Sequence, residues 1–427
     1  MNYTSASREE LLHEYEALSA QYRAYLAEGL SLDLSRGKPS AEQLDLCEDM
    51  FSAVACSADA KSENGFDCRN YGELCGLAEA RRFFSDYTGI PTDNIIVCGN
   101  SSLNLMYDAM VRCLLFGTVG SPRPWCREEK LKFLCPVPGY DRHFAITELF
   151  GFEMIPVDMT ADGPDMDAVE ALVRDPAVKG IWCVPKYSNP TGITYSEETV
   201  RRLATMETAA PDFRIFWDNA YAVHAFSEED DVLTDIFSLA REAGKENRVF
   251  YFTSTSKITF PGGGISMIAA SSENLVGIKA AMTVQTIGHD KINQLRHVRL
   301  FAEDGSLSRR MLAHGAIIGR KFDILFSVLE RELAGLGVAT WTTPKGGYFS
   351  SLDVLDGCAA RVFRLCAEAG VVLTKVGATF PYGRDPRDRN LRLAPSFARD
   401  ADLRKAAEVL TVAVRMAAIE RLVDTEP

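Results

Sequence analysis

The sequence predicts an α/β protein with a mostly parallel sheet, joined to a smaller α+β region. Between about residues 90 and 270, short apolar runs alternate with stretches of helical periodicity, a pattern typical of a parallel sheet with helices on both faces. After about residue 305 the pattern changes to a long helical stretch, several short strand-like runs and a final helix. No repeat, linker or low-complexity tract separates the two regions, so we expect them to pack closely.

The chain opens with a predicted amphipathic helix. Ser7 and Glu10 have the spacing of a capping box, which marks a helix start. Apolar residues then recur at helical spacing, at Leu11, Tyr15, Leu18, Tyr22, Tyr25 and Leu26. This charged segment is unlike a signal peptide.

Five apolar runs in the central region are predicted to be buried strands, because each is short and ends in polar or glycine residues. They are NIIVCG (94–99), KLKFLCPV (130–137), KGIWCVP (179–185), FRIFWD (213–218) and RVFYFTS (248–254). Helical stretches lie between them, among them SLNLMYDAMVRCLLF (102–116) and SEETVRRLATME (196–207).

The C-terminal region is predicted to begin with a long helix whose apolar side carries Ile317, Phe322, Leu325, Leu329 and Leu333. Strand-like runs follow, and they are GVATWTT (337–343), GGYFSSLDV (346–354), GVVLTKV (370–376) and NLRLAPS (390–396). The last predicted helix opens near Asp400.

The composition excludes several classes of function. A net charge of −13, from 46 basic and 59 acidic residues, argues against a nucleic-acid or anionic-membrane surface. No uncharged apolar run approaches the roughly 18 residues needed to span a bilayer. The 11 cysteines form no CxxC pair and the 6 histidines no metal-binding spacing. We therefore expect a cytoplasmic enzyme with reduced thiols and no metal.

Polar residues follow each predicted strand, at the sheet edge where ligands bind in open parallel sheets. Asn100, Ser101 and Ser102 follow the first strand and open a helix, whose free N–H groups can bind an anion. Tyr140 follows the second strand and Asn189 the third. Each of these residues is also common in ordinary loops, so the prediction depends on their convergence.

The last two predicted central strands are followed by residues whose side chains can act as acids, bases or nucleophiles. Asp218 closes the fourth strand, with Tyr221 three residues later, and Ser254 and Lys257 follow the fifth. A lone strand-end lysine is commonly a solvated charge. However, a lysine together with an anion-binding helix start, an aromatic ring and a carboxylate provides the groups that one ligand, pyridoxal 5'-phosphate, requires.

These residues lie within nine motifs that occur in the same order as in a known family. The motifs are LDLSRGKPSAEQLDL, RNYGELCGLAEAR, GNSSLNLMYD, PVPGY, SNPTG, WDNAY, STSK, PKGGYF and LRLAPSFA. With them, nearly the whole chain resembles class I aminotransferases of the fold type I group, and most resembles the actinobacterial aspartate aminotransferase branch. The resemblance implies a large domain over 51–304 and a small domain from both termini, 1–50 and 305–427.

The resemblance also implies roles at the cofactor ring. Lys257 would form the Schiff base and move the substrate's Cα proton, and Asp218 would keep the ring nitrogen protonated. Tyr221 and Asn189 would hydrogen-bond the phenolic oxygen of the ring, and Tyr140 would stack on it. The implied reaction is aspartate aminotransfer to 2-oxoglutarate in two half-reactions, with Lys257, Asp218 and Tyr221 as its catalytic residues.

Other implied roles concern the phosphate and the substrate. Ser101, Ser102 and Ser254 would bind phosphate together with the Asn100 turn. Tyr71 would reach the phosphate of the neighbouring subunit, because such enzymes are homodimers with shared sites. The substrate α-carboxylate would be bound by Arg392, with Asn189 and the Gly37 backbone nearby.

Two features of the family pattern have no clear counterpart here. Residues 258–270 contain no arginine to balance the phosphate, and glycine amides are one possible substitute. No motif names a cation for a second substrate carboxylate, and Arg36, Lys38 and Lys291 are the candidates. Alternatives therefore stay open: an aminotransferase preferring alanine or aromatic amino acids, a β-lyase, or a cofactor-binding regulator.

Overall fold

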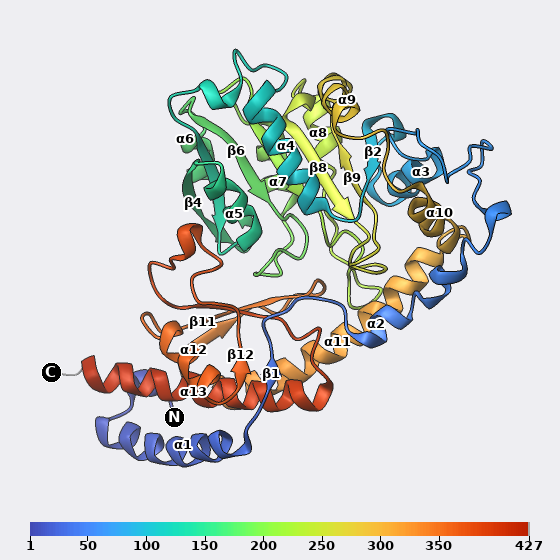
Figure 1. Cartoon of the computed structure of the whole chain (residues 1–427). Helices are drawn as coiled ribbons and strands as arrows, with labels where there is room; N and C mark the ends of the chain where they lie inside the picture. Colours follow the sequence, from blue (N-terminus) through green and yellow to red (C-terminus); the bar gives the residue numbers. More distant parts are fainter. Residues whose placement is uncertain (426–427) are drawn as a thin grey trace.

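The computed structural model describes residues 1–425 and contains a large central sheet (Figure 1). Its strands are β2 (Ile95–Cys98), β3 (Lys132–Val137), β4 (Glu153–Thr160), β5 (Gly163–Pro164), β6 (Val178–Cys183), β7 (Arg214–Asp218), β8 (Val249–Ser254) and β9 (Ser266–Ala269). They lie in the order β2-β9-β8-β7-β6-β3-β4-β5. The run from β8 to β4 is parallel, whereas β9 and β5 pair antiparallel with their neighbours. The predicted α/β class with a mostly parallel sheet is confirmed, and the five predicted strands are β2, β3, β6, β7 and β8.

Helices cover both faces of this sheet because its strands are apolar on both sides. In β7, Ile215 and Trp217 join one hydrophobic cluster while Phe216 between them joins another. The helices of this part are α3 (Ala78–Thr88), α4 (Ser102–Phe116), α5 (Asp141–Leu149), α6 (Met166–Leu172), α7 (Glu197–Thr205), α8 (Ile236–Glu242), α9 (Ser272–Gln285) and α10 (Lys291–Leu300). The cluster of Phe216 contains side chains of α4, α5 and α9, and the cluster of Trp217 contains those of α3, α6, α7, α8 and α10. We call this sheet with α3 to α10 the large-sheet region.

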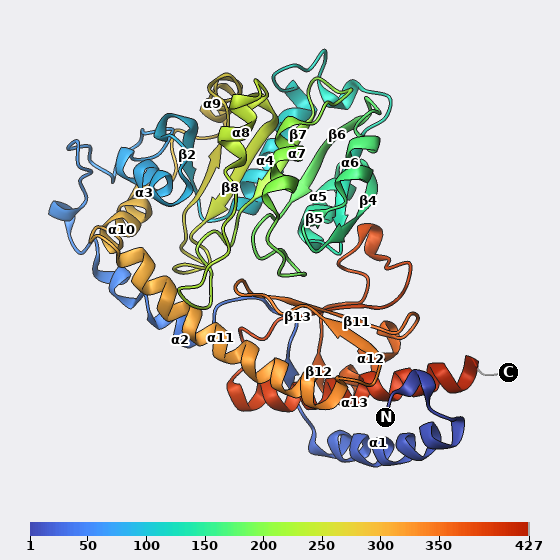
Figure 2. The ribbon, with the colours of Figure 1, turned by 180° about the vertical axis from the view of Figure 1, so that it is seen from behind.

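A second region combines the two ends of the chain (Figures 1 and 2). Its strands are β10 (Ala339–Trp341), β11 (Ser350–Val354) and β13 (Asn390–Leu393), which form an antiparallel sheet, and β1 (Leu32–Asp33) and β12 (Val371–Val372), which pair in parallel. Its helices are α1 (Arg8–Glu28), α2 (Ala41–Asp45), α11 (Ser306–Leu333), α12 (Ala359–Glu368) and α13 (Asp400–Thr425). We call these strands and helices the small-sheet region. Short 3₁₀ turns occur in both regions, at Tyr3–Ser5, Glu48–Ser52, Ser57–Asp59, Thr92–Asn94, Trp125–Arg127, Glu246–Arg248 and Pro381–Gly383.

The ends of the chain meet because α1 buries its apolar face against later helices. Leu11 and Leu18 of α1 share one cluster with Leu325 of α11 and Leu410 of α13. The predicted capping box is present, with the Ser7 side chain accepting from Glu10 N–H and the Glu10 carboxylate accepting from Ser7 N–H.

Backbone hydrogen bonds hold the two regions together beside the carboxyl ends of the parallel strands. Gly139 N–H donates to Thr379 O at 2.8 Å, and Gly347 N–H donates to His224 O at 2.9 Å. The helix α11 extends from the large-sheet region along the small-sheet region in both views (Figures 1 and 2). The proposed division at residues 51 and 304 remains a prediction.

Candidate active site

A cavity of about 200 Å³ lies at the carboxyl ends of the parallel strands. It is lined by Gly37, Ser101, Ser102, Leu103, Met106, Tyr140, Val184, Asn189, Asp218, Ala220, Tyr221, Ser254, Ser256, Lys257 and Phe349. Most of these residues follow strands of the large sheet, and Gly37 and Phe349 come from the small-sheet region. Nine of the predicted site residues therefore meet here, as expected when parallel strands end at one edge.

Asp218 presents a buried carboxylate oxygen without a partner. Asp218 is the last residue of β7 and is 3% exposed, and its Oδ2 lies 3.1 Å from His143 Nε2. Within residues 1–425, Oδ1 has no hydrogen-bond partner. A buried carboxylate oxygen left unpaired is costly, so this atom suits a protonated nitrogen of a bound ligand.

His143 is a site residue that sequence reasoning missed. It lies on α5, three residues after Tyr140, and stacks on Trp182 with ring centroids 4.4 Å apart. Its ring can donate a hydrogen bond to Asp218 and hold that carboxylate in place. The helical spacing from Tyr140 was a usable signal, because residues three apart share a helix face.

Lys257 extends into the cavity beside aromatic rings. Its Nζ lies 5.0 Å from the centroid of the Tyr221 ring and 6.0 Å from that of Tyr348. Burial lowers the pKa of Lys257, and the charge of Asp218 opposes that shift. The cavity therefore favours the neutral amine more than water does, which is the form needed for nucleophilic attack and proton transfer.

The two tyrosines of the cavity keep their protons at neutral pH. Burial, with a smaller contribution from Asp218, raises the pKa of Tyr140 to about 12. Burial also raises the pKa of Tyr221 well above its usual value. Both phenols therefore remain hydrogen-bond donors.

The start of α4 is the position at which the sequence predicts that an anion binds. Ser101 is the N-cap residue, and its side chain makes no capping bond to the helix. Ser254 Oγ donates to Ser256 Oγ at 3.1 Å, and Ser256 Oγ donates to Asn100 O at 2.8 Å. Ser256 was not predicted, although it stands in the same STSK motif as Ser254 and Lys257.

Two other expectations about this anion-binding position find no support in the contacts. Asn100 does not line the cavity, and its side chain turns away to donate to Pro261 O at 3.2 Å. The glycine run 262–264 does not line it either, and Gly263 N–H donates to Phe260 O. Among the residues lining this cavity, Lys257 is the single cation.

Arg392, on β13 of the small-sheet region, does not itself line the cavity but contacts two residues that do. Its Nη1 donates to Asn189 Oδ1 at 3.3 Å and to Asp141 Oδ1 at 3.0 Å. The guanidinium lies over the Phe349 ring, with Cζ 4.9 Å from the ring centroid. The arginine thus contacts Asn189 and Phe349, both of which line the cavity.

The arrangement fits pyridoxal 5'-phosphate. The unpaired Oδ1 of Asp218 suits a pyridinium N–H, and the uncapped Ser101 suits a phosphate. An amine of lowered pKa and a flanking aromatic ring complete the set of groups that this cofactor requires.

Comparison with known proteins agrees with this geometry. The sequence model of a family described as "Aspartate amino-transferase" matches residues 6–426. This chain belongs to that aminotransferase family. It is 46% identical to an aspartate aminotransferase from Corynebacterium glutamicum, over 97% of this chain and 95% of the relative. It is 48% identical to a putative aminotransferase from Mycolicibacterium smegmatis, over 99% of each.

The fold of this aminotransferase also matches solved structures. A crystal structure of an aspartate transaminase from Corynebacterium glutamicum superposes with a TM-score of 0.96, at 45% identity, covering 99% of both chains. The match confirms the fold type I architecture expected from the sequence.

Four other predicted residues of the aminotransferase lie outside the cavity. Tyr71 is 77% exposed and does not line it. Lys38 Nζ lies 3.8 Å above the Phe397 ring, Arg36 points to Asp33 at 3.5 Å, and Lys291 Nζ donates to His289 O at 3.2 Å. None of the three cation candidates lines the cavity of its own chain.

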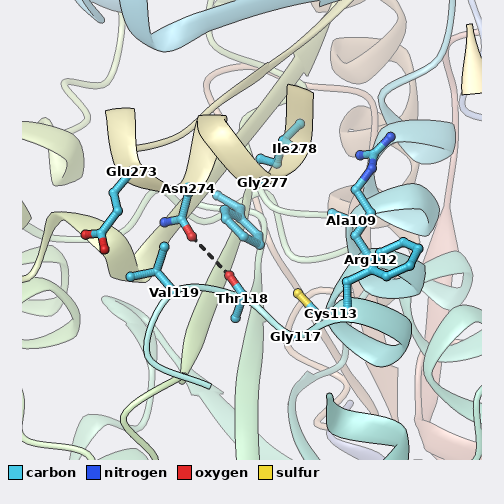
Figure 3. Close-up of a pocket in the computed structure, with 12 residues that line it drawn as sticks. Ala109, Arg112, Cys113, Gly117, Thr118, Val119, Glu273, Asn274, Gly277 and Ile278 are labelled. Atoms are coloured by element: carbon cyan, nitrogen blue, oxygen red, sulfur yellow. Dashed lines mark hydrogen bonds between the residues drawn. The ribbon is translucent and has the colours of Figure 1, made fainter. Parts of the chain in front are cut away.

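A second cavity of the aminotransferase, of about 230 Å³, lies between α4 and α9 (Figure 3). Phe116 at the C-terminal end of α4 lines it, whereas Ser102 at the N-terminal end lines the first cavity. Thr118 Oγ1 donates to Asn274 Oδ1 across its wall at 3.0 Å. It contains none of the strand-end residues, so we assign the chemistry to the first cavity.

Residues 1–425 contain no group of three or more histidine, cysteine or acidic side chains placed to bind a metal. None of the helices described there has the length and apolar character needed to cross a bilayer.

Proposed function

We propose that the protein is a pyridoxal-phosphate-dependent aspartate aminotransferase that moves the amino group of L-aspartate to 2-oxoglutarate. One observation carries the proposal: the unpaired Oδ1 of Asp218 and the amine of Lys257 belong to one cavity. Membership of the family and the named activity of the 46% identical relative support the choice of substrate.

The cofactor would be held by groups around the whole cavity. Asp218, positioned by His143, would accept a hydrogen bond from the ring nitrogen, and Tyr140 would cover the ring face. Tyr221 and Asn189 would donate to the phenolic oxygen. When bound, this cofactor supplies an aldehyde carbon for the amino group and a ring that withdraws electrons.

The phosphate would lie at the start of α4. Ser101, Ser102, Ser254 and the newly found Ser256 offer hydroxyls there, and the helix N-terminus offers backbone N–H groups and a favourable dipole. The Asn100 turn would contribute backbone only, because its side chain bonds to Pro261 O.

Lys257 would perform the proton transfers. Burial lowers its pKa and so favours the free amine, which can remove the Cα proton of the substrate and later return it. Tyr221, whose ring is the nearer of the two around Nζ, limits where the amine can lie.

The substrate α-carboxylate would bind to Arg392. A guanidinium can form two parallel hydrogen bonds to a carboxylate, and Asn189 and the Gly37 backbone lie on the same side of the cavity. Gly37 is required there by space, since a Cβ would lie 2.1 Å from Phe349 Cζ.

We further propose that the enzyme is a cytoplasmic homodimer. Tyr71 is exposed on its own chain and would reach the phosphate bound by the neighbouring subunit. The cavity of one chain lacks a second cation for a dicarboxylate, which is consistent with a site completed by a partner.

The test is a donor and acceptor screen of purified, cofactor-loaded protein with product analysis. Oxaloacetate and glutamate formed from aspartate and 2-oxoglutarate, without ammonia, support the proposal. Pyruvate with ammonia from sulfur amino acids would instead identify a β-lyase. Preference for alanine or phenylalanine would keep the aminotransferase and remove aspartate.

A further inference from the structure

The guanidinium of Arg392 is already engaged by protein groups. Its Nη1 donates to Asp141 Oδ1 at 3.0 Å and to Asn189 Oδ1 at 3.3 Å, and its Nε donates to Thr374 Oγ1 at 3.3 Å. Within residues 1–425, all its hydrogen bonds and its ion pair use Nε or Nη1, so Nη2 has no partner. An arginine has five N–H donors, so both free ones are on a single nitrogen.

This pattern leaves no free edge for a carboxylate. Bidentate binding uses two nitrogens of the fork, either Nη1 with Nη2 or Nε with Nη2. Each pair has one nitrogen already occupied, by Asp141 and Asn189 in the first and by Thr374 in the second. An incoming carboxylate that binds through two nitrogens must therefore displace one of these partners.

Of these three partners of Arg392, Asp141 is the one that, like the ligand, presents a carboxylate. The Arg392 side chain is 10% exposed, so leaving its charge unpaired in the empty site would be costly. The Asp141 side chain is 32% exposed and can turn to water when it is displaced. Asp141 also lies in the first turn of α5, where the helix dipole favours a negative charge.

The ion pair joins the two regions of the molecule. Asp141 belongs to α5 of the large-sheet region and Arg392 to β13 of the small-sheet region, 251 positions apart in sequence. Exchanging Asp141 for a ligand carboxylate therefore replaces an ion pair between the two regions by a contact with the ligand.

We propose that Asp141 is an internal competitor of the substrate carboxylate: it pairs with Arg392 in the empty site and leaves that pair when a carboxylate ligand binds. The proposal rests on the proposed role of Arg392 in binding the substrate. By linkage, Asp141 stabilises the empty enzyme and weakens its affinity for carboxylates by the same factor.

The test measures succinate binding to the cofactor-loaded enzyme, because succinate has two carboxylates and no amino or keto group to react. In Asp141→Asn the dissociation constant, measured by calorimetry, should fall about two- to fivefold, the range for one partly exposed ion pair. The melting temperature without ligand should fall, and its rise on saturation with succinate should be larger than in the wild type. An unchanged or higher dissociation constant in this variant overturns the proposal.

Two controls separate this proposal from the others. Asp356→Asn removes an ion pair within the small-sheet region, with Arg387 at 2.9 Å, and should leave succinate binding unchanged.

Arg392→Lys should weaken succinate binding about tenfold or more, and wild-type affinity in that variant would refute the proposed substrate role of Arg392 itself. If Arg392→Lys weakens binding but Asp141→Asn does not tighten it, the competitor proposal alone fails. Asp141→Ser should reproduce the tightening, and it replaces Asp141→Asn as the deciding variant if that protein does not fold.

Discussion

Replacing Asp218 by asparagine changes one charge at the centre of the site and little else. The amide has nearly the same volume, and its oxygen can still accept the hydrogen bond that His143 donates at 3.1 Å. What it cannot supply is a negative charge at the buried Oδ1 position, which has no partner within residues 1–425. The variant therefore isolates the interaction between the carboxylate and the ring nitrogen of the cofactor.

The size of the effect follows from the kind of contact that is lost. A hydrogen bond to a charged group contributes roughly 1.5–3 kcal/mol, and Asp218 is 3% exposed, so solvent screens it little. If the charge matters mainly in the transition state, kcat should fall about 10- to 150-fold. Cofactor binding should be largely kept, because the start of α4 and Lys257 are unchanged.

The assay compares kcat at saturating aspartate and 2-oxoglutarate with cofactor content measured by absorbance after desalting. Asp175→Asn is the matched control, since it removes a 41% exposed carboxylate paired with Lys132 at 3.0 Å on the same sheet. A fully loaded Asp218→Asn enzyme whose kcat stays within about twofold of wild type would refute the role of this carboxylate. Complete loss of cofactor with the fold intact would show that its role is in binding instead.

Four further predictions use other parts of the structure. Borohydride reduction followed by peptide mapping should place the pyridoxyl group on Lys257, and an adduct on any other lysine would contradict the assignment. The value of kcat/KM for aspartate should exceed those for alanine and phenylalanine by at least about tenfold, with 2-oxoglutarate as acceptor, or the aspartate assignment fails. Gly37→Ala should lower kcat/KM about tenfold or more, because the Cβ of the alanine would displace the Phe349 ring that lies against Arg392. Wild-type kinetics in this variant would show that the ring moves freely. Burial lowers the pKa of His297 to about 4, so this histidine binds a proton more readily in the unfolded chain than in the folded one. It should therefore lower the free energy of unfolding as pH falls from about 6.5 to 4, by up to about 1.4 kcal/mol per pH unit. Thermal unfolding of His297→Gln should depend less on pH over that range, and an equal dependence would exclude this histidine as a cause.

Local patterns in the sequence were sufficient to predict the sheet and most of the cavity. Apolar runs ending in polar residues correspond to β2, β3, β6, β7 and β8, and parallel strands bring their carboxyl ends to one edge. This is why Ser101, Tyr140, Asn189, Asp218 and Lys257 could be expected to converge without any knowledge of loop geometry.

Contacts between distant segments were decided by tertiary packing alone. The pairing of His143 with Asp218 spans 75 positions and that of Asp141 with Arg392 spans 251. The exposed position of Tyr71 likewise depends on how its loop lies against the rest of the chain. Periodicity and strand-end chemistry act over a few residues, whereas these contacts depend on how α5 and β13 pack, and that packing is the sum of many weak interactions along the whole chain.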